Sequence, residues 1–332
     1  MFRFPNTRLR RKRSSKWIRN LISEVSLSVS DLVLPLFVHD QEDIITPIVE
    51  LPDIKRYSIN TLISIVQKAR DHGINAIALF PVITNSLKSN DAQEAYNPDN
   101  LICRAIRKIK LQISDIGIIA DVALDPYTTH GHDGILQLNT MKIQNDHTVS
   151  VLCKQAIVLA QAGCNIVAPS DMMDGRVQKI REALDENGFQ DISILSYAVK
   201  YCSHFYAPFR QVVGSYDASQ IMDKSTYQMD FHNAREAIYE SEMDINEGAD
   251  FIMIKPGLPY LDIIKTASDR FSLPIFAYQV SGEYAMIKSA ANNGWLDYHK
   301  VMYESLISFK RAGVSGIFTY AALDMIDYIL SQ

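Results

Sequence analysis

The apolar residues of this chain gather in short unbroken runs that are separated by longer amphipathic stretches. Unbroken runs, rather than alternating apolar and polar positions, are typical of parallel strands buried on both faces. Eight runs predict strands, at residues 32–38, 75–81, 116–122, 165–169, 192–198, 250–255, 274–280 and 315–320.

Helix-like stretches lie between these runs. They cover residues 59–72, 97–110, 147–162, 174–186, 232–247, 259–270, 297–312 and 322–331. Glycines that can end a helix stand just before several strands, as in DHGINAI and QAGCNIV. Repeated strand–helix units predict an α/β fold, a (β/α)8 TIM barrel rather than an open doubly wound sheet.

Catalytic side chains of such a barrel stand where the strands end at their C-terminal side. The polar residues at these ends are Asp121, Asp125, Ser170, Asp171, Lys200, Lys255, Ser281 and Tyr320. We expect them to face one mouth.

Two of these strand-end residues are lysines. Lys255 ends the run FIMIK, and burial lowers the pKa of a lysine because it disfavours the ammonium form. A neutral amine attacks ketones and forms a Schiff base, although an isolated lysine here could equally reach solvent from the strand end. Lys200 ends the preceding strand, and two neighbouring ammonium groups are expected to lower each other's pKa. One amine suits a class I aldolase, whereas two amines can hold two carbonyl substrates.

The charge of the chain is unevenly distributed. Residues 1–20 hold eight of the 33 Lys and Arg and none of the 38 Asp and Glu, so the rest of the chain is acidic. This basic head fits a nucleic-acid-binding arm, an organellar transit peptide, or an arm that docks on an acidic neighbouring subunit. Composition alone leaves the three open, and it excludes a secretory signal because no apolar segment follows.

The cysteines and the apolar runs predict a cytoplasmic protein without a membrane span. The longest apolar runs, such as LVLPLFV, fall far short of the roughly 18 residues that a span needs. No CxxC motif is present, which disfavours a disulfide framework and a zinc ribbon. The four cysteines are Cys103, Cys153, Cys164 and Cys202.

Four long motifs resemble the 5-aminolevulinate dehydratase, or porphobilinogen synthase, family. They are MIKPGLPYLD around Lys255, SYAVK followed by FYAPFR, APSDMMDGR, and DVALDPYTTHGHDG. The likeness runs from FPNTRLRR near the N-terminus to TYAALD near the C-terminus. It implies a lyase that condenses two 5-aminolevulinate molecules to porphobilinogen, with loss of two waters, in tetrapyrrole (heme) biosynthesis.

The resemblance also implies the organisation of the chain. The family is a (β/α)8 barrel whose N-terminal arm wraps a neighbour, commonly in a homo-octamer. We therefore expect an arm for subunit contacts at residues 1–30 and a catalytic barrel at residues 31–332. This favours the third interpretation of the basic head and disfavours a transit peptide, because RLRRKR at residues 8–13 begins inside the family's own pattern. The acidic rest of the chain disfavours nucleic-acid binding.

Matching positions carry over the family's substrate-binding roles. Lys255 resembles the Schiff-base lysine of the first-bound substrate and Lys200 that of the second. The other expected contacts are Ser281 and Tyr320 for the first carboxylate; Arg210, Lys224 and Gln228 for the second; Asp121 and Ser170 for the first amino group; and Phe205 and Tyr206 as hydrophobic walls. Residues 203–228 look like a lid that excludes water. Lys224 stands where some members have Arg, so a point charge replaces a bidentate contact.

The expected metal sites also follow from the resemblance. Zinc-dependent members carry three cysteines where this chain has Ala123, Asp125 and Asp133. Without thiolates a tight catalytic Zn²⁺ site is not expected, and the chain resembles the aspartate-rich branch that responds to Mg²⁺ or K⁺. Asp125 and Asp133 are possible weak ligands of an active-site cation, whereas His130 and His132 are expected to make loop hydrogen bonds.

A second, allosteric Mg²⁺ site is expected at Glu240. This residue stands fifteen positions before Lys255, as the allosteric glutamate of the family does. A single carboxylate is enough because Mg²⁺ keeps most of its water. Glu236 shares the helix face and contributes indirectly.

Three hypotheses compete with the synthase. One is a catalytically silent assembly protein, against which the presence of both lysines argues. A class I aldolase on the same barrel needs only one of the two amines. A nucleic-acid-binding protein would use the basic head and bind in a salt-sensitive way.

Overall fold

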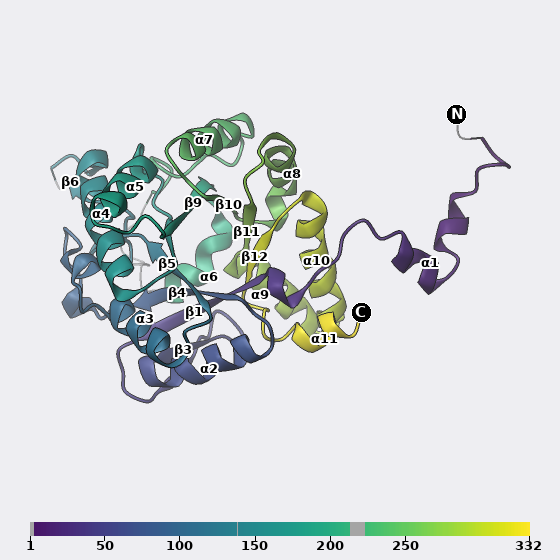
Figure 1. Cartoon of the computed structure of the whole chain (residues 1–332), viewed down its shortest axis with the longest axis horizontal. Helices are drawn as coiled ribbons and strands as arrows, with labels where there is room; N and C mark the ends of the chain where they lie inside the picture. The colour runs from purple at the N-terminus through teal and green to yellow at the C-terminus, as the bar shows by residue number, and fades with distance from the viewer. Residues whose placement is uncertain (1–2, 138, 213–222) are drawn as a thin grey trace.

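The strands of this protein close into one parallel barrel. The computed structural model describes residues 3–137, 139–212 and 223–332. Within these residues eight strands pair in a ring, and the ring closes where Leu32 and Val33 pair with Ile317 and Phe318 (Figure 1). In ring order the strands are β1 (Leu32–His39), β4 (Ala76–Val82), β5 (Gly117–Val122), β8 (Ile166–Pro169), β9 (Ser193–Lys200), β10 (Phe251–Lys255), β11 (Ile275–Gln279) and β12 (Gly316–Thr319). The predicted α/β barrel is confirmed.

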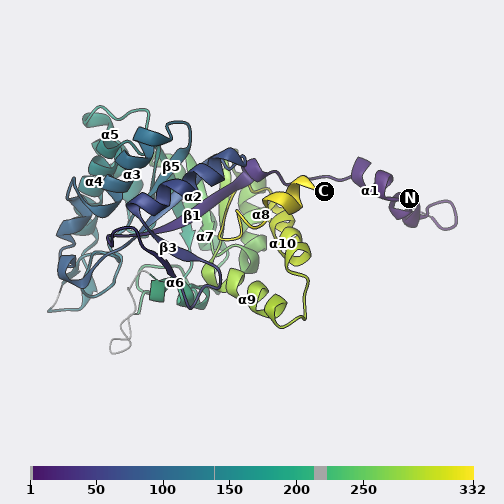
Figure 2. The same ribbon diagram turned by 90° about the horizontal axis from the view of Figure 1, so that it is seen from below.

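Helices cover the outside of the barrel and return the chain between strands (Figures 1 and 2). Those at the predicted positions are α2 (Ile59–Asp71), α3 (Leu101–Gln112), α4 (Asn145–Ala162), α5 (Arg176–Glu186), α7 (Arg235–Asn246), α8 (Leu261–Arg270), α10 (Tyr298–Ala312) and α11 (Ile326–Leu330). Helix α3 begins later than predicted because the Asn100 side chain caps it, accepting a hydrogen bond from the Cys103 amide. Helix α11 is shorter than predicted because residues 320–325 form turns.

One helix next to the site was not predicted. Helix α9 (Ser281–Asn292) follows β11 directly and reads SGEYAMIKSAAN. Its small and polar residues form only a narrow apolar stripe, and its buried residues include Glu283. The helical period is therefore weak in the sequence although the helix packs firmly.

Several short strands lie in the loops that follow the barrel strands. Strand β3 (Lys55–Ser58) extends the sheet beside the end of β1 and pairs with the antiparallel strand β2 (Ile45–Pro47). A second small hairpin joins β6 (Leu136–Gln137) to β7 (Lys142–Ile143). These pairs were not predicted, because strands of two to four residues carry too little pattern to be recognised.

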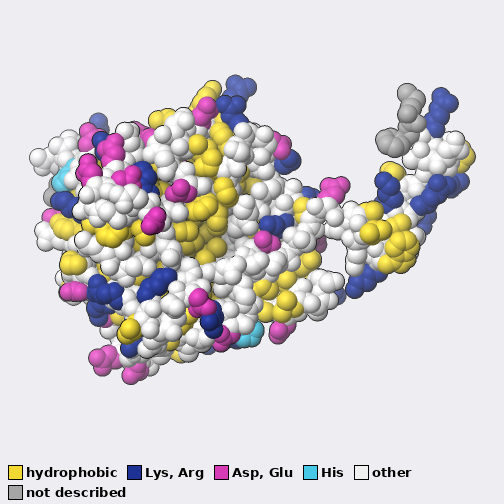
Figure 3. Space-filling model, in the orientation of Figure 1, with side chains coloured by type: hydrophobic (Ala, Val, Ile, Leu, Met, Phe, Trp, Pro, Cys, Tyr) yellow, Lys and Arg dark blue, Asp and Glu magenta, His cyan; other side chains and the backbone are white. Residues whose placement is uncertain are grey.

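The N-terminal segment stands apart from the barrel. Residues 3–31 contain the short helices η1 (Leu9–Arg13), α1 (Lys16–Leu21) and η2 (Val29–Asp31). Helices η1 and α1 project beyond the barrel in Figures 1 and 2, whereas η2 packs on it through the buried Val29. Basic and apolar side chains gather on this projection (Figure 3), where Trp17 is 67% and Leu21 is 74% exposed. A monomer gains nothing from this exposed apolar surface.

Two further expectations concern the whole chain. None of the four cysteines forms a disulfide in the structure. Cys103 and Cys164 are buried, and Cys153 and Cys202 are half-buried. Among the described residues, none of the helices combines the length and apolar character that crossing a membrane requires.

A buried arginine links three elements behind the barrel mouth. Arg176, at the start of α5, is 2% exposed. Its guanidinium lies 3.1 Å from Asp244 of α7 and 3.6 Å from Asp171 after β8. Ser196 of β9 also donates a hydrogen bond to Asp244. Because charges this deep are costly without partners, the cluster depends on every member.

We expect Asp244→Ala to lower the free energy of unfolding by about 3–5 kcal/mol, because it leaves the buried Arg176 guanidinium with too few partners. Urea unfolding at one fixed protein concentration measures this. The control is Asp115→Ala, which breaks the exposed pair with Arg70 and should leave the free energy of unfolding nearly unchanged, because solvent screens such a pair. Equal losses in both variants would contradict the interpretation.

Candidate active site

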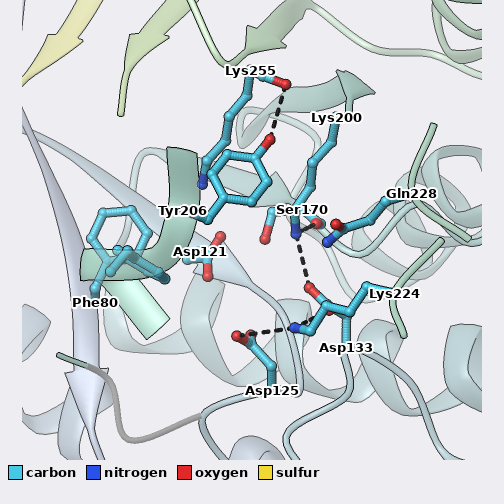
Figure 4. A pocket seen from close by; sticks show the side chains of 11 residues that line it. Phe80, Asp121, Asp125, Asp133, Ser170, Lys200, Tyr206, Lys224, Gln228 and Lys255 are labelled. Carbon is cyan, nitrogen blue, oxygen red and sulfur yellow. Dashed lines mark hydrogen bonds and ion pairs between the residues drawn. The ribbon is translucent and has the colours of Figure 1, made fainter. Parts of the chain in front are cut away.

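A small polar cavity lies at the C-terminal ends of the strands, where the sequence predicted the site. In Figure 4 two lysines point into it from neighbouring strands, with three aspartates opposite. The cavity volume is about 30 Å³, so it has room for only a few waters. The lining residues are Phe80, Asp121, Asp125, Asp133, Ser170, Lys200, Tyr206, Phe209, Lys224, Gln228 and Lys255.

Lys255 is held in a largely apolar setting. Its backbone pairs in register with Lys200 on the neighbouring strand, and its carbonyl accepts a hydrogen bond from the Tyr206 hydroxyl at 3.0 Å. Four aromatic rings surround its Nζ with centroids at 4.6–5.3 Å, those of Tyr197, Tyr206, Phe209 and Tyr278. Burial, followed by the charge of Lys200, lowers the pKa of Lys255 to about 7. A large neutral fraction therefore exists at neutral pH.

Lys200 differs from Lys255 in charge. Its Nζ donates to Asp133 Oδ1 at 2.8 Å and to the Ser170 carbonyl. Burial alone would lower the pKa of Lys200, but Asp133 and the other carboxylates outweigh burial and raise it above the ordinary value. The prediction that Lys200 lowers the pKa of Lys255 is therefore confirmed. The pKa of Lys200 itself is raised, because the nearby carboxylates outweigh the effects that lower it.

Asp133 is the centre of the polar network. Its Oδ2 accepts hydrogen bonds from Lys224 Nζ at 2.6 Å and from the Tyr227 hydroxyl at 2.8 Å, while Lys200 binds Oδ1. Burial opposes ionisation, but the two ammonium groups prevail and hold the pKa of Asp133 far below its usual range. Asp133 is thus a permanent carboxylate.

The two aspartates that were expected to hold a cation contact a lysine of the same chain. Lys224 Nζ lies 3.8 Å from Asp125 Oδ2 and 2.6 Å from Asp133 Oδ2. Burial, followed by the negative charge of Asp133, raises the pKa of Asp125. Lys224 was predicted to bind a substrate carboxylate, but in this structure its ammonium binds the aspartates.

The histidines of this loop make hydrogen bonds, as predicted. The Tyr227 hydroxyl lies 3.1 Å from His132 Nδ1, and His130 Nε2 lies 3.4 Å from the Asn90 carbonyl. Burial and the positive charge of Lys224 lower the pKa of His132 to about 4. His132 is therefore neutral at physiological pH.

Asp121 and Ser170 lie together beside the lysines. Burial raises the pKa of Asp121 to about 7, the negative charge of Asp125 adds to this, and a hydrogen bond from Ser170 opposes it. Asp121 Oδ1 is buried and has no hydrogen-bond partner among the described residues. The pair offers acceptor atoms to a donor that enters the cavity.

Ser281 and Tyr320 lie behind the rings that surround Lys255. The Ser281 hydroxyl accepts a hydrogen bond from the Phe209 amide at 3.1 Å and donates one to the Phe205 carbonyl at 3.3 Å. The hydroxyls of Tyr320 and Tyr278 are 3.2 Å apart. Both predicted residues thus lie on the Lys255 side of the cavity.

The remaining predicted contacts are only partly described. Gln228 lines the cavity, and its Oε1 is buried without a hydrogen-bond partner among the described residues. Arg210 belongs to α6 (Ala207–Val212), but its side chain is outside the described residues. Of the predicted lid at residues 203–228, residues 213–222 are also outside them.

A second, more open cavity adjoins the first, and Gln228 lines both. Its volume is about 350 Å³, and its acidic lining residues are Asp174, Glu236 and Glu240. Burial raises the pKa of Glu240 to about 7, while Arg176 opposes this effect. Nowhere in the described residues do three or more His, Cys, Asp or Glu side chains form a group that could hold a metal ion.

Several site residues escaped the sequence analysis. Tyr197 and Tyr278 sit within apolar strand runs, and Phe80 and Phe209 were not singled out. The alternation along each strand, which sends every second side chain into the barrel, is the signal that could have found the strand residues. Tyr227 had no such signal, because a loop brings it to Asp133.

Comparison with known proteins points to one family. The family model described as delta-aminolevulinic acid dehydratase matches residues 6–328. The chain is 50% identical over 315 residues to delta-aminolevulinic acid dehydratase of Bradyrhizobium diazoefficiens, covering 95% of this chain and 88% of the relative. It is 49% identical over 327 residues to the chloroplastic protein of Selaginella martensii, covering 98% and 78%.

A solved structure agrees in fold and sequence. The crystal structure of delta-aminolevulinic acid dehydratase from Toxoplasma gondii ME49, in complex with the reaction product porphobilinogen, superimposes with a TM-score of 0.96. The two chains are 48% identical, and the alignment covers 98% of this chain and 92% of the other.

We expect the reaction of Lys255 with a small ketone to follow the neutral amine. Because its pKa is about 7, the rate should fall about tenfold per pH unit below that value and level off above it. The charge of Asp121 raises the pKa of Lys255, so Asp121→Asn should move the midpoint to lower pH. Borohydride trapping of the imine between about pH 5 and 9 measures the pH dependence of the rate in the wild type and the shift of its midpoint in Asp121→Asn.

The exposed variant Ser64→Ala on α2 serves as the control and should keep the wild-type midpoint. A wild-type rate that still rises about tenfold per unit up to about pH 9, as for an amine with the ordinary lysine pKa of about 10.4, would contradict the interpretation.

Proposed function

The chain belongs to the delta-aminolevulinic acid dehydratase family, and on this premise we propose that Lys255 and Lys200 are its two Schiff-base lysines. The protein is a porphobilinogen synthase, a hydro-lyase that condenses two molecules of 5-aminolevulinate to porphobilinogen in heme and tetrapyrrole biosynthesis. The observation that carries the proposal is the register pairing of Lys200 with Lys255 at the mouth of one barrel. The class I aldolase alternative is set aside, because it leaves Lys200 without a role.

The difference in charge between the lysines supports an order of events. Lys255, with its pKa near 7, attacks the ketone of the first substrate, and loss of one water yields an iminium. Lys200 is charged and paired with Asp133, so it must release a proton before it attacks the second ketone. Each iminium acidifies the neighbouring carbon, which prepares the carbon–carbon bond.

The remaining steps complete the ring. After the carbon–carbon bond forms, one lysine leaves by elimination, and the amino group of one substrate displaces the other lysine and forms the carbon–nitrogen bond. Proton loss then makes the pyrrole aromatic. Two waters leave in total. Holding two flexible molecules in register supplies much of the acceleration, because their freedom is lost before the chemical step.

Each substrate carboxylate needs its own donors. We assign the first carboxylate to Ser281 and Tyr320, on the Lys255 side, with Phe205 and Tyr206 as apolar walls. We assign the second to Lys224, Gln228 and Arg210. The cavity of about 30 Å³ supports movement of Lys224 away from Asp133 when substrate enters, since that space is too small for two substrates.

Asp121 and Ser170 are assigned to the amino group of the first substrate. The unpartnered Oδ1 of Asp121 can accept a hydrogen bond from an ammonium group. A carboxyl group with a pKa near 7 can also exchange protons at neutral pH.

We assign an allosteric Mg²⁺ site to Glu240, in line with the aspartate-rich branch of the family. The cavity of about 350 Å³ accommodates a hydrated ion, and Mg²⁺ keeps several waters when one or two carboxylates bind it. Glu236 and Asp174 lie in the same cavity and can accept hydrogen bonds from those waters. The bound ion would supply positive charge that keeps Glu240 ionised.

The active site itself is unsuited to tight binding of Zn²⁺ and offers at most a weak site for a monovalent cation. Asp125 and Asp133 are hard oxygen donors unsuited to tight Zn²⁺ binding. The ammonium of Lys224 already neutralises them, so a monovalent ion could bind there only weakly.

The projecting segment is assigned to subunit contacts. Its exposed Trp17 and Leu21 and its basic side chains suit an acidic, partly apolar neighbour. We propose a homo-octamer in which residues 1–30 pack on another copy, and a cytoplasmic location in keeping with the free cysteines.

Borohydride reduction in the presence of substrate tests the two lysines. Peptide mass mapping should find label at both Lys255 and Lys200. Lys200→Ala should keep label at Lys255 but lose porphobilinogen synthesis by more than about 10³-fold, as expected when a covalent catalytic group is removed. Absence of label from both lysines in the wild type would refute the assignment.

Glu240→Gln tests the magnesium site. We expect Mg²⁺ to activate the chelated wild type but not this variant, because the amide lacks the charge that binds the ion. Glu242→Gln, a change on the same helix at a half-buried residue that does not line this cavity, should respond like the wild type. Activity against Mg²⁺ concentration is the measurement, and equal responses of all three proteins would argue against Glu240.

A further inference from the structure

A buried carboxylate behind the Lys255 strand has no part in the chemistry described above. Glu283, in the first turn of α9, is 0% exposed. Its Oε2 accepts hydrogen bonds from the amides of Gly257 at 3.2 Å and Val280 at 2.7 Å. Its Oε1 accepts one from the amide of Leu258 at 2.6 Å. Both oxygens are thus occupied by backbone donors.

These three amides come from two separate parts of the site. Gly257 and Leu258 follow Lys255 at the end of β10, whereas Val280 ends the turn from β11 into α9. A glutamate at this helix position commonly binds only the amide that precedes the helix. Here the same carboxylate also binds the chain just beyond the lysine, so it joins two strand ends.

The start of α9 is in turn fixed against the segment that carries two of the aromatic rings. The Ser281 hydroxyl bonds the Phe209 amide and the Phe205 carbonyl. A Cβ added to Gly282 would lie 2.6 Å from the Phe205 carbonyl oxygen, so the two backbones are in direct contact. Any shift of the α9 start therefore moves Ser281, Tyr206 and Phe209 together.

Gly257 adds a second close contact at this junction. A Cβ there would overlap the Phe309 ring of α10 and lie 3.0 Å from the Tyr278 carbonyl oxygen. The chain after Lys255 therefore cannot shift outward to compensate for a lost hydrogen bond. Glu283 and this packing both restrain it.

We propose that Glu283 is a positioning residue that holds the Lys255 strand end and the carboxylate-binding turn at Ser281 in one fixed relation. The proposal rests on the assignment of Lys255 as a Schiff-base lysine. Through Gly257 and Leu258, Glu283 fixes the backbone from which the Lys255 side chain extends. Through Val280 it fixes the turn that presents Ser281. Lys255, which would bind the ketone of one substrate, and Ser281, which would bind its carboxylate, are thereby held at a fixed distance from each other.

The electrostatic environment agrees with this role. Burial raises the pKa of Glu283 to about 7, whereas its three amide partners favour the ionised form. The positive end of the α9 dipole favours that form too.

The test compares Glu283→Gln with the wild type. An amide retains one oxygen, which can keep Gly257 and Val280, but its NH₂ group then faces the Leu258 amide and that hydrogen bond is lost. The probe is 4-oxopentanoate, the substrate without its amino group, which can form an imine but cannot complete the condensation. Borohydride trapping then reports the rate of imine formation at Lys255 and at Lys200 separately.

We expect the rate at Lys255 to fall about 10- to 100-fold, as for loss of one hydrogen bond to a charged group, while the rate at Lys200 changes less than about twofold. The same variant should show a raised KM and a lowered kcat for porphobilinogen synthesis, because Ser281 and Lys255 lose register. Glu283→Asp keeps the charge but shortens the side chain. Its rate of imine formation at Lys255 should lie between those of the wild type and Glu283→Gln.

The matched control is Asp297→Asn. Asp297 also accepts a helix amide, that of Lys300 at the start of α10, but it is exposed and does not line the Lys255 cavity. This variant should react like the wild type.

The outcomes separate this inference from the proposed function. Wild-type protein that is not labelled at Lys255 would refute the Schiff-base assignment itself. Wild-type labelling together with an unchanged Lys255 rate in folded Glu283→Gln, even at a lowered melting temperature, would refute the positioning role and leave a purely structural one.

Discussion

The site depends on one buried carboxylate that two lysines share. Asp133 binds the ammonium groups of Lys200 and Lys224 and the hydroxyl of Tyr227. A carboxylate enclosed in this way stays ionised, and it keeps Lys200 charged in a setting where burial alone would discharge it. The positive charge of Lys200 in turn helps to discharge Lys255. A single anion therefore gives two identical side chains on neighbouring strands different chemical characters.

This division of charge suits a reaction that joins two copies of one molecule unequally. An enzyme that treats both copies alike would have no means of deciding which becomes which part of the product. Lys255 lies among aromatic rings, and its lowered pKa favours the neutral, nucleophilic amine. Lys200 lies among carboxylates, and its raised pKa favours the ammonium form, which cannot attack a ketone. The asymmetry comes from the surroundings of the two amines and not from the amines themselves.

Much of the architecture could be predicted from the sequence, because unbroken apolar runs report burial on both faces directly. The strand ends then placed Lys200, Lys255, Asp121 and Ser170 at one mouth. The charge of Lys200 could not be predicted, because its partner Asp133 is 67 residues away on a loop. Helix α9 was not predicted because SGEYAMIKSAAN has few large apolar residues. The three hydrogen bonds that Glu283 accepts at the start of this helix could therefore not be predicted either. Patterns along a chain reveal which surfaces are buried, but not which polar groups meet there.

The aromatic enclosure of Lys255 has a consequence for chemical selectivity in the cell. A primary amine that is largely uncharged near neutral pH would react with any sugar, aldehyde or carbon dioxide molecule that reached it. Exposed lysines escape such damage because they are protonated, but Lys255 lacks that protection. Its shielding is steric instead: the residue is 8% exposed, four rings surround its nitrogen, and the cavity before it is scarcely larger than a few waters. Lys255 is thereby reserved for molecules able to open the site.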